Sequence, residues 1–471
     1  WYVQNLKSSS DNYIGFGGSD DVTFTGSSSQ ETINLNINRT SEYSGNLTIT
    51  MGDGNDSINS AKVKNTDSID MGAGDDTVSL MINGSYGTPT IGAANFTKLD
   101  GGAGTDTLKF EEGTPDADTE LTLTTGGAVN FENLTGGSNA EVLKGDNNAN
   151  VLTGNNGADT LYGYGGNDTL YADSSSGMDN TGNQTSADVL YGGAGNDALH
   201  GNDGDNTLDG GTGADTIYSG GGSDIIILRS GDGGTTQSAG DTLADFTDGT
   251  DSLGLDSSLT FNDLTIEQSG SDTVIKEGSN YLTTLTGIAA SNITILDFQS
   301  TNTSNQTLNG TSGNDGLVGG AGGDTFNGGA GSDSLVGWNG NDTFNIRSKT
   351  GSYADTVNGG AGTDTLDVNY SGITSLKDFT LSSSGSNIIL TDASGGSITF
   401  SNIESLNVNS IAYSPPPDTP INSGDGGLSN AFYSTAEKSI LSYGAAIWYV
   451  QNLKSSSDNY IGFGGSDDVT F

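Results

Sequence analysis

Residues 192–227 read GGAGNDALH, GNDGDNTLD, GGTGADTIY and SGGGSDIII, which are four consecutive blocks of nine residues. Upstream, the same frame runs GDNNANVLT, GNNGADTLY and GYGGNDTLY from Gly145 and, after an interruption at 172–182, NQTSADVLY from Asn183. A second array starts at Gly310 with GTSGNDGLV, GGAGGDTFN, GGAGSDSLV and GWNGNDTFN; after a slip of four residues it continues with TGSYADTVN and GGAGTDTLD. The shared pattern is G-G-x-G-x-D-x-U-x, where U is apolar, and a repeat of this period decides the fold.

Each nine-residue unit (nonad) reads as a tight turn followed by a very short strand. Glycine at the first positions allows backbone with positive φ and close approach of neighbouring turns. The x-U-x segment is a strand with one inward side chain, and stacked strands of this kind form parallel sheets. The U residues then form a thin core; examples are Leu199, Leu208, Ile217, Leu335 and Phe344. A single nonad buries too little apolar surface to fold, so the stack needs another source of stability.

The sixth position supplies that source, because it is nearly always aspartate. It is occupied by Asp159, Asp168, Asp188, Asp197, Asp215 and Asp224 in the first array, and by Asp315, Asp324, Asp333, Asp342, Asp355 and Asp364 in the second. Stacking places these carboxylates in rows along the sheet. Neighbours in a row are about 5 Å apart, so their like charges repel. A hard dication between them removes the repulsion. All-oxygen donors, no Cys and a single His favour calcium over zinc or copper.

The nonads resemble the repeats-in-toxin (RTX) family, whose repeats form a calcium-binding parallel β-helix. The resemblance covers 145–227 and 310–367, and single units such as MGDGNDSI (51–58), MGAGDDTV (71–78), GGAGTDTL (101–108) and FGGSDDV (16–22) extend it toward the N-terminus. Residues 241–255 resemble the segment that closes such rolls, and the stretch after it, which ends with LTGIAASNITILDF (285–298), resembles the β-rich cap. Residues 110–140 and 376–409 also have strand-like alternation.

The resemblance implies that a coil holds two nonads and that calcium lies between one turn and the turn two units later. It pairs Asp159 with Asp188, Asp168 with Asp197, Asp197 with Asp215, Asp315 with Asp333, and Asp324 with Asp342. Outside the arrays Asp20, Asp56, Asp76 and Asp106 are further candidate ligands, with a solvated turn residue as an equal alternative for Asp20 and Asp106. The turn carbonyls that would complete the shells belong to turns opened by Gly154, Gly163, Gly192, Gly210, Gly310, Gly319, Gly328 and Gly337. Asn150 and Asn206 replace aspartate at two sixth positions, and Asp203 and Asp205 are expected to compensate at the second.

Composition excludes several functions. Lys plus Arg is 14 and Asp plus Glu is 59, so the net charge of −45 repels nucleic acid and anionic membranes. The sequence contains no run of eighteen apolar residues, so it predicts no membrane-spanning helix. The single histidine, His200, occupies a ninth position, and neither H-E-x-x-H nor G-x-S-x-G occurs. Paired carboxylates would also suit a glycosidase, but their regular spacing favours calcium. We therefore expect no enzymatic activity.

The sequence predicts an all-β fold of tandem calcium-binding parallel β-rolls with β-rich caps. The expected divisions are a degenerate RTX-like region (1–140), a roll with its cap (141–300), a second roll with its cap (301–412), a Pro-rich linker with a short helix (413–447) and a terminal copy (448–471). The helix is expected over 429–443. Residues 448–471 repeat 1–24 without a change, which favours one period of a longer tandem-repeat chain over a terminal duplication.

The expected function is an extracellular structural protein of a bacterial surface layer, sheath, filament or adhesin stalk, with calcium as the folding trigger. Expected partners are copies of itself or adjacent repeat units, with a cell-surface polysaccharide as an alternative. The resemblance adds type I secretion. A second hypothesis is an adhesin module that binds glycan or a surface through its tyrosines and the 172–182 insert. A third is an accessory domain of a secreted hydrolase.

Overall fold

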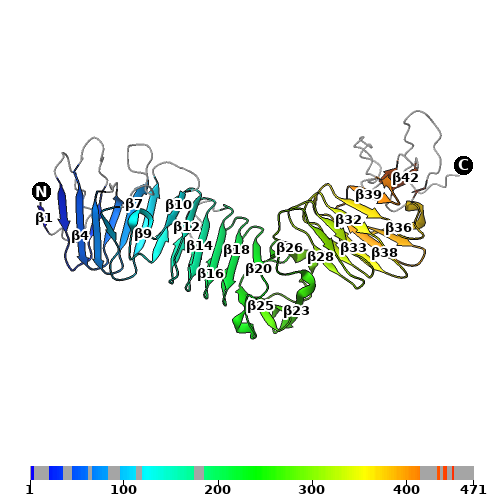
Figure 1. The fold of residues 1–471 in the computed structure, drawn as a ribbon, viewed down its shortest axis with the longest axis horizontal. Coiled ribbons are helices and arrows are strands. Elements are labelled where there is room, and N and C mark those ends of the chain that lie inside the picture. Colours follow the sequence, from blue (N-terminus) through cyan, green and yellow to red (C-terminus); the bar gives the residue numbers. More distant parts are fainter. Residues whose placement is uncertain are drawn as a thin grey trace, which may run out of the picture. The chain divides into compact units, whose positions relative to one another are not determined.

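The computed structural model describes residues 2–4, 21–35, 45–61, 66–82, 96–112, 119–173, 185–413, 432–434, 439–442 and 448–449. The chain divides into two compact units. The first comprises residues 1–253 and 265–292, and the second comprises residues 254–264 and 293–471. Each unit is an all-β roll in which short parallel strands lie side by side (Figure 1).

In both rolls two nonads make one coil, with one strand on each of two sheets. Leu152 therefore pairs with Leu170, eighteen residues later, and both strands run in the same direction. The insert before Asn183 lengthens one coil but leaves the register intact, since Leu161 pairs with Leu190. Insertions are accommodated at turns because the strands alone set the register.

One face of the first roll is a thirteen-stranded sheet that runs through the whole unit. In chain order its strands are β3 (Thr32–Asn34), β5 (Ser57–Ala61), β7 (Thr77–Ile82), β9 (Thr107–Glu112), β11 (Asn133–Thr135), β13 (Val151–Thr153), β15 (Thr169–Tyr171), β17 (Ala198–His200), β19 (Thr216–Tyr218), β21 (Asp241–Leu243), β23 (Leu264–Ser269), β24 (Asp272–Glu277) and β25 (Asn280–Leu285). The sheet passes through residue 140 without a break, since β11 pairs with both β9 and β13.

Two shorter sheets make the opposite face of this roll. The first contains β1 (Tyr2–Gln4), β2 (Val22–Thr25), β4 (Leu47–Asp53), β6 (Ser68–Ala73) and β8 (Lys98–Asp100). The second contains β10 (Thr119–Thr122), β12 (Glu141–Lys144), β14 (Thr160–Gly165), β16 (Val189–Ala194), β18 (Thr207–Thr212), β20 (Ile225–Leu228) and β22 (Ser252–Leu255). Single-turn 3₁₀ segments are η1 (Thr125–Gly127) and η2 (Gln237–Ala239).

Antiparallel strands close the first roll at its C-terminal end. β25 joins the sheet in parallel with β21, and β24 then pairs with β25 in the antiparallel direction. The direction changes where the nonads stop, which agrees with the cap expected in this part of the sequence.

The second roll repeats this plan with two six-stranded sheets. One contains β27 (Thr307–Asn309), β29 (Thr325–Asn327), β32 (Thr343–Ile346), β35 (Thr365–Val368), β39 (Ser405–Val408) and β40 (Ile411–Tyr413). The other contains β28 (Gly316–Val318), β30 (Ser334–Val336), β33 (Ala354–Asn358), β36 (Phe379–Ser384), β37 (Asn387–Asp392) and β38 (Ser397–Ser401). The remaining elements are β26 (Phe298–Ser300), the pair β31 (Asn339–Gly340) and β34 (Ala361–Gly362), and the 3₁₀ segments η3 (Phe261–Asp263), η4 (Ile295–Asp297) and η5 (Leu376–Asp378). β36, β37 and β38 are the antiparallel cap.

The core of each roll is thin and consists of apolar side chains that project inward from both sheets, as the repeat predicts. Leu199, Leu208 and Ile217 in the first roll and Leu335 and Phe344 in the second are at most 1% exposed. One large apolar residue per nine is enough because the coil interior is narrow, and this explains the low hydrophobic content of 31%.

The helix expected over 429–443 is wrong. Phe432–Ser434 (β41) and Ser439–Ser442 (β42) are strands that pair antiparallel, and β43 (Trp448–Tyr449) pairs with β42. Aromatic residues, isoleucine and serine are mediocre helix formers, and aromatic and β-branched residues favour strands, so the apolar spacing alone was misleading. No helix within the described ranges is long and apolar enough to cross a membrane.

Candidate metal centres

The sixth residues of successive coils lie in four rows, one beside each long sheet. Row 1 contains Glu31, Asp56, Asp76, Asp106, Glu132, Asn150, Asp168, Asp197, Asp215 and Asp241; row 2 contains Glu141, Asp159, Asp188, Asn206, Asp224 and Asp251; row 3 contains Gln306, Asp324, Asp342, Asp364 and Glu404; row 4 contains Asp315, Asp333 and Asp355. Rows 1 and 2 belong to the first roll, and rows 3 and 4 to the second.

A backbone-to-side-chain ladder connects the members of each row, except between Glu132 and Asn150, where Asn150 Nδ2 donates to the Glu132 carbonyl oxygen at 3.0 Å. The N–H of one sixth residue donates to a side-chain oxygen of the next, at 2.6–3.2 Å. The five aspartate pairs named from the sequence are all neighbours in this ladder; for example, the Asp168 N–H lies 2.7 Å from Asp197 Oδ1. The ladder leaves each carboxylate with a second oxygen.

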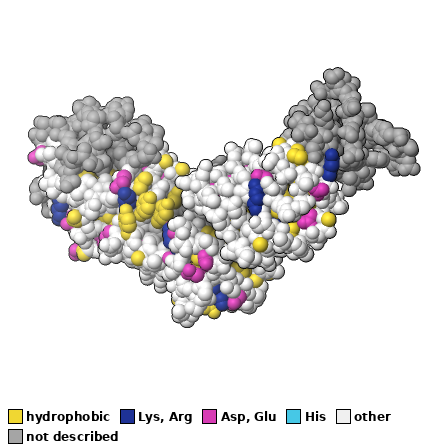
Figure 2. All heavy atoms as spheres, turned by 45° about the vertical axis from the view of Figure 1, so that its right-hand side comes forward, with side chains coloured by type: hydrophobic (Ala, Val, Ile, Leu, Met, Phe, Trp, Pro, Cys, Tyr) yellow, Lys and Arg dark blue, Asp and Glu magenta, His cyan; other side chains and the backbone are white. Residues whose placement is uncertain are grey.

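That second oxygen is the unusual feature of the rows. Within the described residues it is buried and has no hydrogen-bond partner in most sixth-position aspartates. The atoms are the Oδ2 atoms of Asp56, Asp76, Asp106, Asp159, Asp168, Asp197, Asp215, Asp224, Asp342, Asp355 and Asp364. Figure 2 agrees, since acidic side chains occupy only scattered places on the face it draws although Asp and Glu number 59. A buried carboxylate oxygen without a partner is costly, so these atoms require a cation or a proton.

The first glycine of each nonad shows where such a cation would be held. A Cβ added to Gly192 would lie 2.5 Å from Asp197 Oδ2 and 2.6 Å from the Gly210 carbonyl oxygen; at Gly319 the corresponding distances are 2.6 Å to Asp324 Oδ2 and 2.7 Å to the Gly337 oxygen. The carboxylate and a carbonyl of the next coil thus converge above the glycine, in a space that any side chain would fill. Carboxylate plus carbonyl oxygen is the donor set of calcium.

Burial also raises the pKa of these carboxyls, because it disfavours their charged form. The pKa is raised to about 8 at Asp159, to about 7 at Asp168 and Asp224, and to about 7 at Asp342. Neighbouring carboxylates of the same row add to the shift. Calcium bound between the rows' oxygens would supply positive charge that keeps these groups ionised, so the donor residues fit the metal.

Protein donors already satisfy a few members of the rows. Asn202 Nδ2 donates to Asp188 Oδ2 at 2.6 Å, and Asn206 Nδ2 donates to Asn202 Oδ1 at 3.1 Å. Asp203 and Asp205 were expected to compensate for Asn206, but both are exposed on the turn, and Asn202 lies beside it instead. Asp203 and Asp205 point outward because residues on either side of a buried turn residue face solvent.

The structure adds row members that the nonad pattern did not reveal. Glutamates lie at or near row ends, for example Glu141 and Glu404, and Asp241 and Asp251 close rows 1 and 2. Asp241-Thr-Leu and Asp251-Ser-Leu keep the Asp-x-U part of the repeat, which was the available signal. Asp20 lies outside the described residues. No three acidic or histidine side chains converge on one point in the described part.

Ninth-position side chains form aromatic stacks on the outer surface of the first roll. His200 lies between Tyr171 and Tyr218, with ring centroids 4.7 and 4.9 Å away and nearly parallel planes. Tyr162 stacks on Tyr191 at 4.8 Å. Burial lowers the pKa of His200, so the imidazole is neutral at pH 7 and packs as an aromatic ring.

Comparison with known proteins identifies the repeats. The family described as RTX calcium-binding nonapeptide repeat (4 copies) matches residues 135–175, 185–208, 200–233, 309–344 and 349–369. No curated protein matches the chain. Among solved structures, the extracellular lipase LipA from Serratia marcescens aligns with 64% of this chain and 43% of that chain, at 11% identity and a TM-score of 0.15. The chain spans less than half of the length of that lipase. With a TM-score this low, the likeness indicates nothing about the activity of the present chain.

The matched segments carry most of the ladder steps and most of the partnerless carboxylate oxygens, while those of Asp56, Asp76 and Asp106 lie outside them. RTX nonapeptides are calcium-binding motifs typical of secreted proteins, and they act as structural elements. The chain therefore contains RTX calcium-binding nonapeptide repeats, and these repeats fold as parallel β-rolls.

Proposed function

We propose that this chain is a calcium-stabilised extracellular structural protein that self-associates into a surface layer, sheath or filament. The observation that carries the proposal is the continuity of the carboxylate rows, which run through nearly every coil of both rolls. Calcium is thus used along the whole length of the rolls and stiffens them. Most of the buried acidic groups lie at the sixth positions, where they serve to hold the coils of the rolls together.

Calcium dependence couples folding to export. The metal-free chain has a net charge of −45 and rows of buried carboxylates that repel one another, which favours an extended, secretable chain. Millimolar calcium outside the cell suits the weak sites of extracellular modules, and binding to the folded state alone stabilises that state by mass action. Type I secretion and a place on a bacterial surface are part of this proposal.

The ends of the rolls favour end-to-end association. The C-terminal ends carry antiparallel caps, whereas β3, at the other end of the thirteen-stranded sheet of the first roll, pairs only with β5 among the described residues. Parallel strands at an uncapped end can be extended by another chain. The ninth-position tyrosines support a structural role, because stacked rings cover one another's faces and leave less ring surface for a sugar.

Sedimentation velocity during a calcium titration tests the proposal. We expect compaction as calcium rises from chelated to about 10 mM, followed by large species that a chelator disperses. Compaction to a stable monomer would contradict self-association and favour the adhesin module. No change at any calcium concentration would contradict calcium-dependent folding itself.

A further inference from the structure

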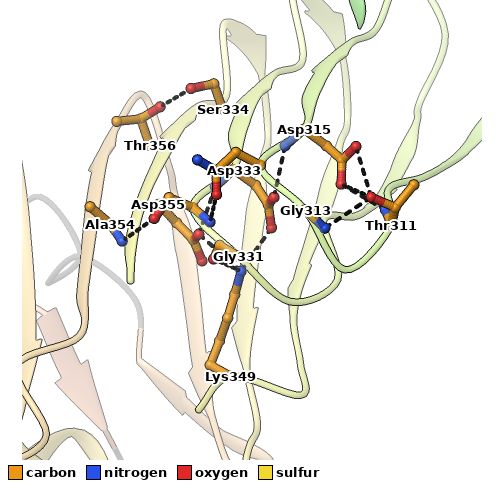
Figure 3. A network of polar contacts seen from close by, with 12 residues as sticks. Thr311, Gly313, Asp315, Gly331, Asp333, Ser334, Lys349, Ala354, Asp355 and Thr356 are labelled. Carbon is orange, nitrogen blue, oxygen red and sulfur yellow. Dashed lines mark hydrogen bonds and ion pairs between the residues drawn. The ribbon is translucent and has the colours of Figure 1, made fainter. Parts of the chain in front are cut away.

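Row 4 contains one buried cation that belongs to the protein. Lys349 Nζ lies 2.7 Å from Asp333 Oδ2, 2.9 Å from Asp355 Oδ1 and 3.0 Å from the Gly331 carbonyl oxygen (Figure 3). Its side chain is 1% exposed, and the two carboxylates are fully buried. An ammonium group has three protons to donate, and here each has one oxygen acceptor.

These three acceptors are of the kinds that the rows offer to a metal: a turn carbonyl, a carboxylate of the same turn and a carboxylate of the next coil. As a result Asp333 Oδ2 has a partner, whereas the Oδ2 atoms of Asp197, Asp215 and Asp342 in other rows have none within the described residues. We propose that Lys349 is a tethered cation that occupies one cation position of row 4 in place of calcium. The inference rests on the calcium-binding role of the other positions.

The lysine reaches this place through the slip of four residues in the second array. Residues 346–349 are the extra residues of the coil, so Asp333 and Asp355 are 22 rather than 18 residues apart. Two of the 14 basic residues of the chain, Arg347 and Lys349, are in this short insertion. Arg347 pairs with Asp367 at a partly exposed site, while Lys349 enters the row.

The same coil contains a matched position without a lysine. The Asp342 N–H donates to Asp364 Oδ1, also across 22 residues, and the Oδ2 atoms of both aspartates are buried without a partner among the described residues. The steps Asp333–Asp355 and Asp342–Asp364 therefore differ in their cation while the coil is the same. The first should hold without calcium, and the second should depend on it.

The test compares calcium bound per chain, by equilibrium dialysis of the full chain, for the wild type and three variants. Lys349→Ala removes the ammonium and its stem, and we expect it to bind one more calcium ion than the wild type. Lys349→Met removes the charge but fills the space, and should bind no more than the wild type. Arg347→Ala is the matched control and should also leave the number unchanged.

Equal calcium numbers for the wild type and a folded Lys349→Ala would overturn the inference. A wild type that binds no calcium would instead overturn the proposed function, so the two failures are distinguishable.

Hydrogen exchange on the wild-type chain tests the same point without a substitution. The chelator is raised to the concentration at which the Asp342 amide begins to lose protection. At that concentration the Asp333 amide should exchange at least about 10-fold more slowly than the Asp342 amide, as expected for a hydrogen bond to a charged group. In saturating calcium the two amides should be protected alike. Loss of protection at both amides together would show that Lys349 does not replace the metal.

Discussion

Row 1 of the first roll and row 4 of the second have the same backbone ladder, but in row 4 the second oxygen of one carboxylate, Asp333 Oδ2, has a cation of the protein as its partner. In row 1 the Oδ2 atoms of Asp168, Asp197 and Asp215 are buried without a partner among the described residues. In row 4 Lys349 holds Asp333 and Asp355 together. The nonad backbone therefore does not require a particular cation. It requires that a positive charge, a proton or a hydrogen-bond donor meets each buried oxygen, and the sequence decides which.

Removing calcium should have the largest effect and should separate the two regions. At pH 7 a chelator should unfold the first roll, because its rows lose several cations at once and each site saturated 100-fold above its Kd contributes about 2.7 kcal/mol. Circular dichroism should report loss of strand signal, and limited proteolysis should cleave the first roll before the coil that holds Lys349. A chain that keeps its full strand signal in chelator would refute the comparison.

Acid should partly replace calcium in row 1. The carboxyl of Asp168 has a pKa near 3.8 when unfolded, and burial raises it to about 7 in the fold; Asp56, Asp106 and Asp215 are raised to about 6. Because the folded state keeps these protons to higher pH, protonation stabilises the metal-free fold. That contribution is complete below about pH 3.8 and is lost as pH rises through about 6–7.

A pH series of thermal unfolding in chelator should therefore show the melting temperature falling from pH 4 to pH 8. In saturating calcium the trend should reverse, because acid displaces the metal. The reversal is the control, since the reduction in net charge is similar in both series. If the melting temperature changed with pH in the same direction in chelator and in calcium, the row 1 carboxylates would not be the calcium ligands.

Substitution of one carboxylate in each roll should give effects that differ in their calcium dependence. Asp333→Asn removes a charged partner of the buried Lys349 ammonium and should cost about 2 kcal/mol with or without calcium. Asp197→Asn should cost stability only when calcium is present, because without metal its Oδ2 has no partner to lose. Urea unfolding in calcium and in chelator measures both. A calcium-dependent loss in Asp333→Asn would contradict the comparison.

The smallest expected effect concerns the second position of the nonad, which needs positive φ. Tyr164 in the first roll has φ 74° and Trp338 in the second has φ 70°. Tyr164→Gly should stabilise the roll by about 1 kcal/mol, since glycine has no left-handed strain. Trp338→Gly should not, because it loses the hydrogen bond from Nε1 to the Phe298 carbonyl oxygen, at 2.6 Å. Thermal unfolding in calcium of the two variants checks this; stabilisation by both would show that the indole bond contributes nothing.

Much of the architecture follows from the repeat, because nine residues contain a turn, one strand and one inward side chain. The parallel rolls and the inward U residues were predicted from that period, and the structure confirms them. The aspartate pairs came from the resemblance to the RTX family, and their members are neighbours in the structure. In residues 1–140 the prediction was coarser, since coils there span 20, 25 or 30 residues between ladder partners and hide the period. The strands of one face nevertheless continue the thirteen-stranded sheet, while those of the other face form a separate five-stranded sheet.

Lys349 was missed for a different reason. The slip of four residues was treated as a break in frame, although a basic pair in so acidic a chain was a signal that an insertion carries a charge partner. Nothing in the sequence shows which way such a side chain turns; packing of the extra turn against Asp333 and Asp355 decides it. The helix over 429–443 failed because a helical spacing of apolar residues can also arise in two short strands.

The stacking distance has a consequence for ions in general. Strands about 4.8 Å apart, with one row on each of two sheets, give roughly one carboxylate per 2.4 Å of axis. In water two unit charges interact with energy RT at about 7 Å, so this spacing is dense enough to condense counterions, as on a nucleic acid. A metal-free roll is thus a polyelectrolyte, and monovalent salt competes with calcium for its axis. The exception is the step that holds Lys349, where the counterion is covalently attached and cannot be exchanged.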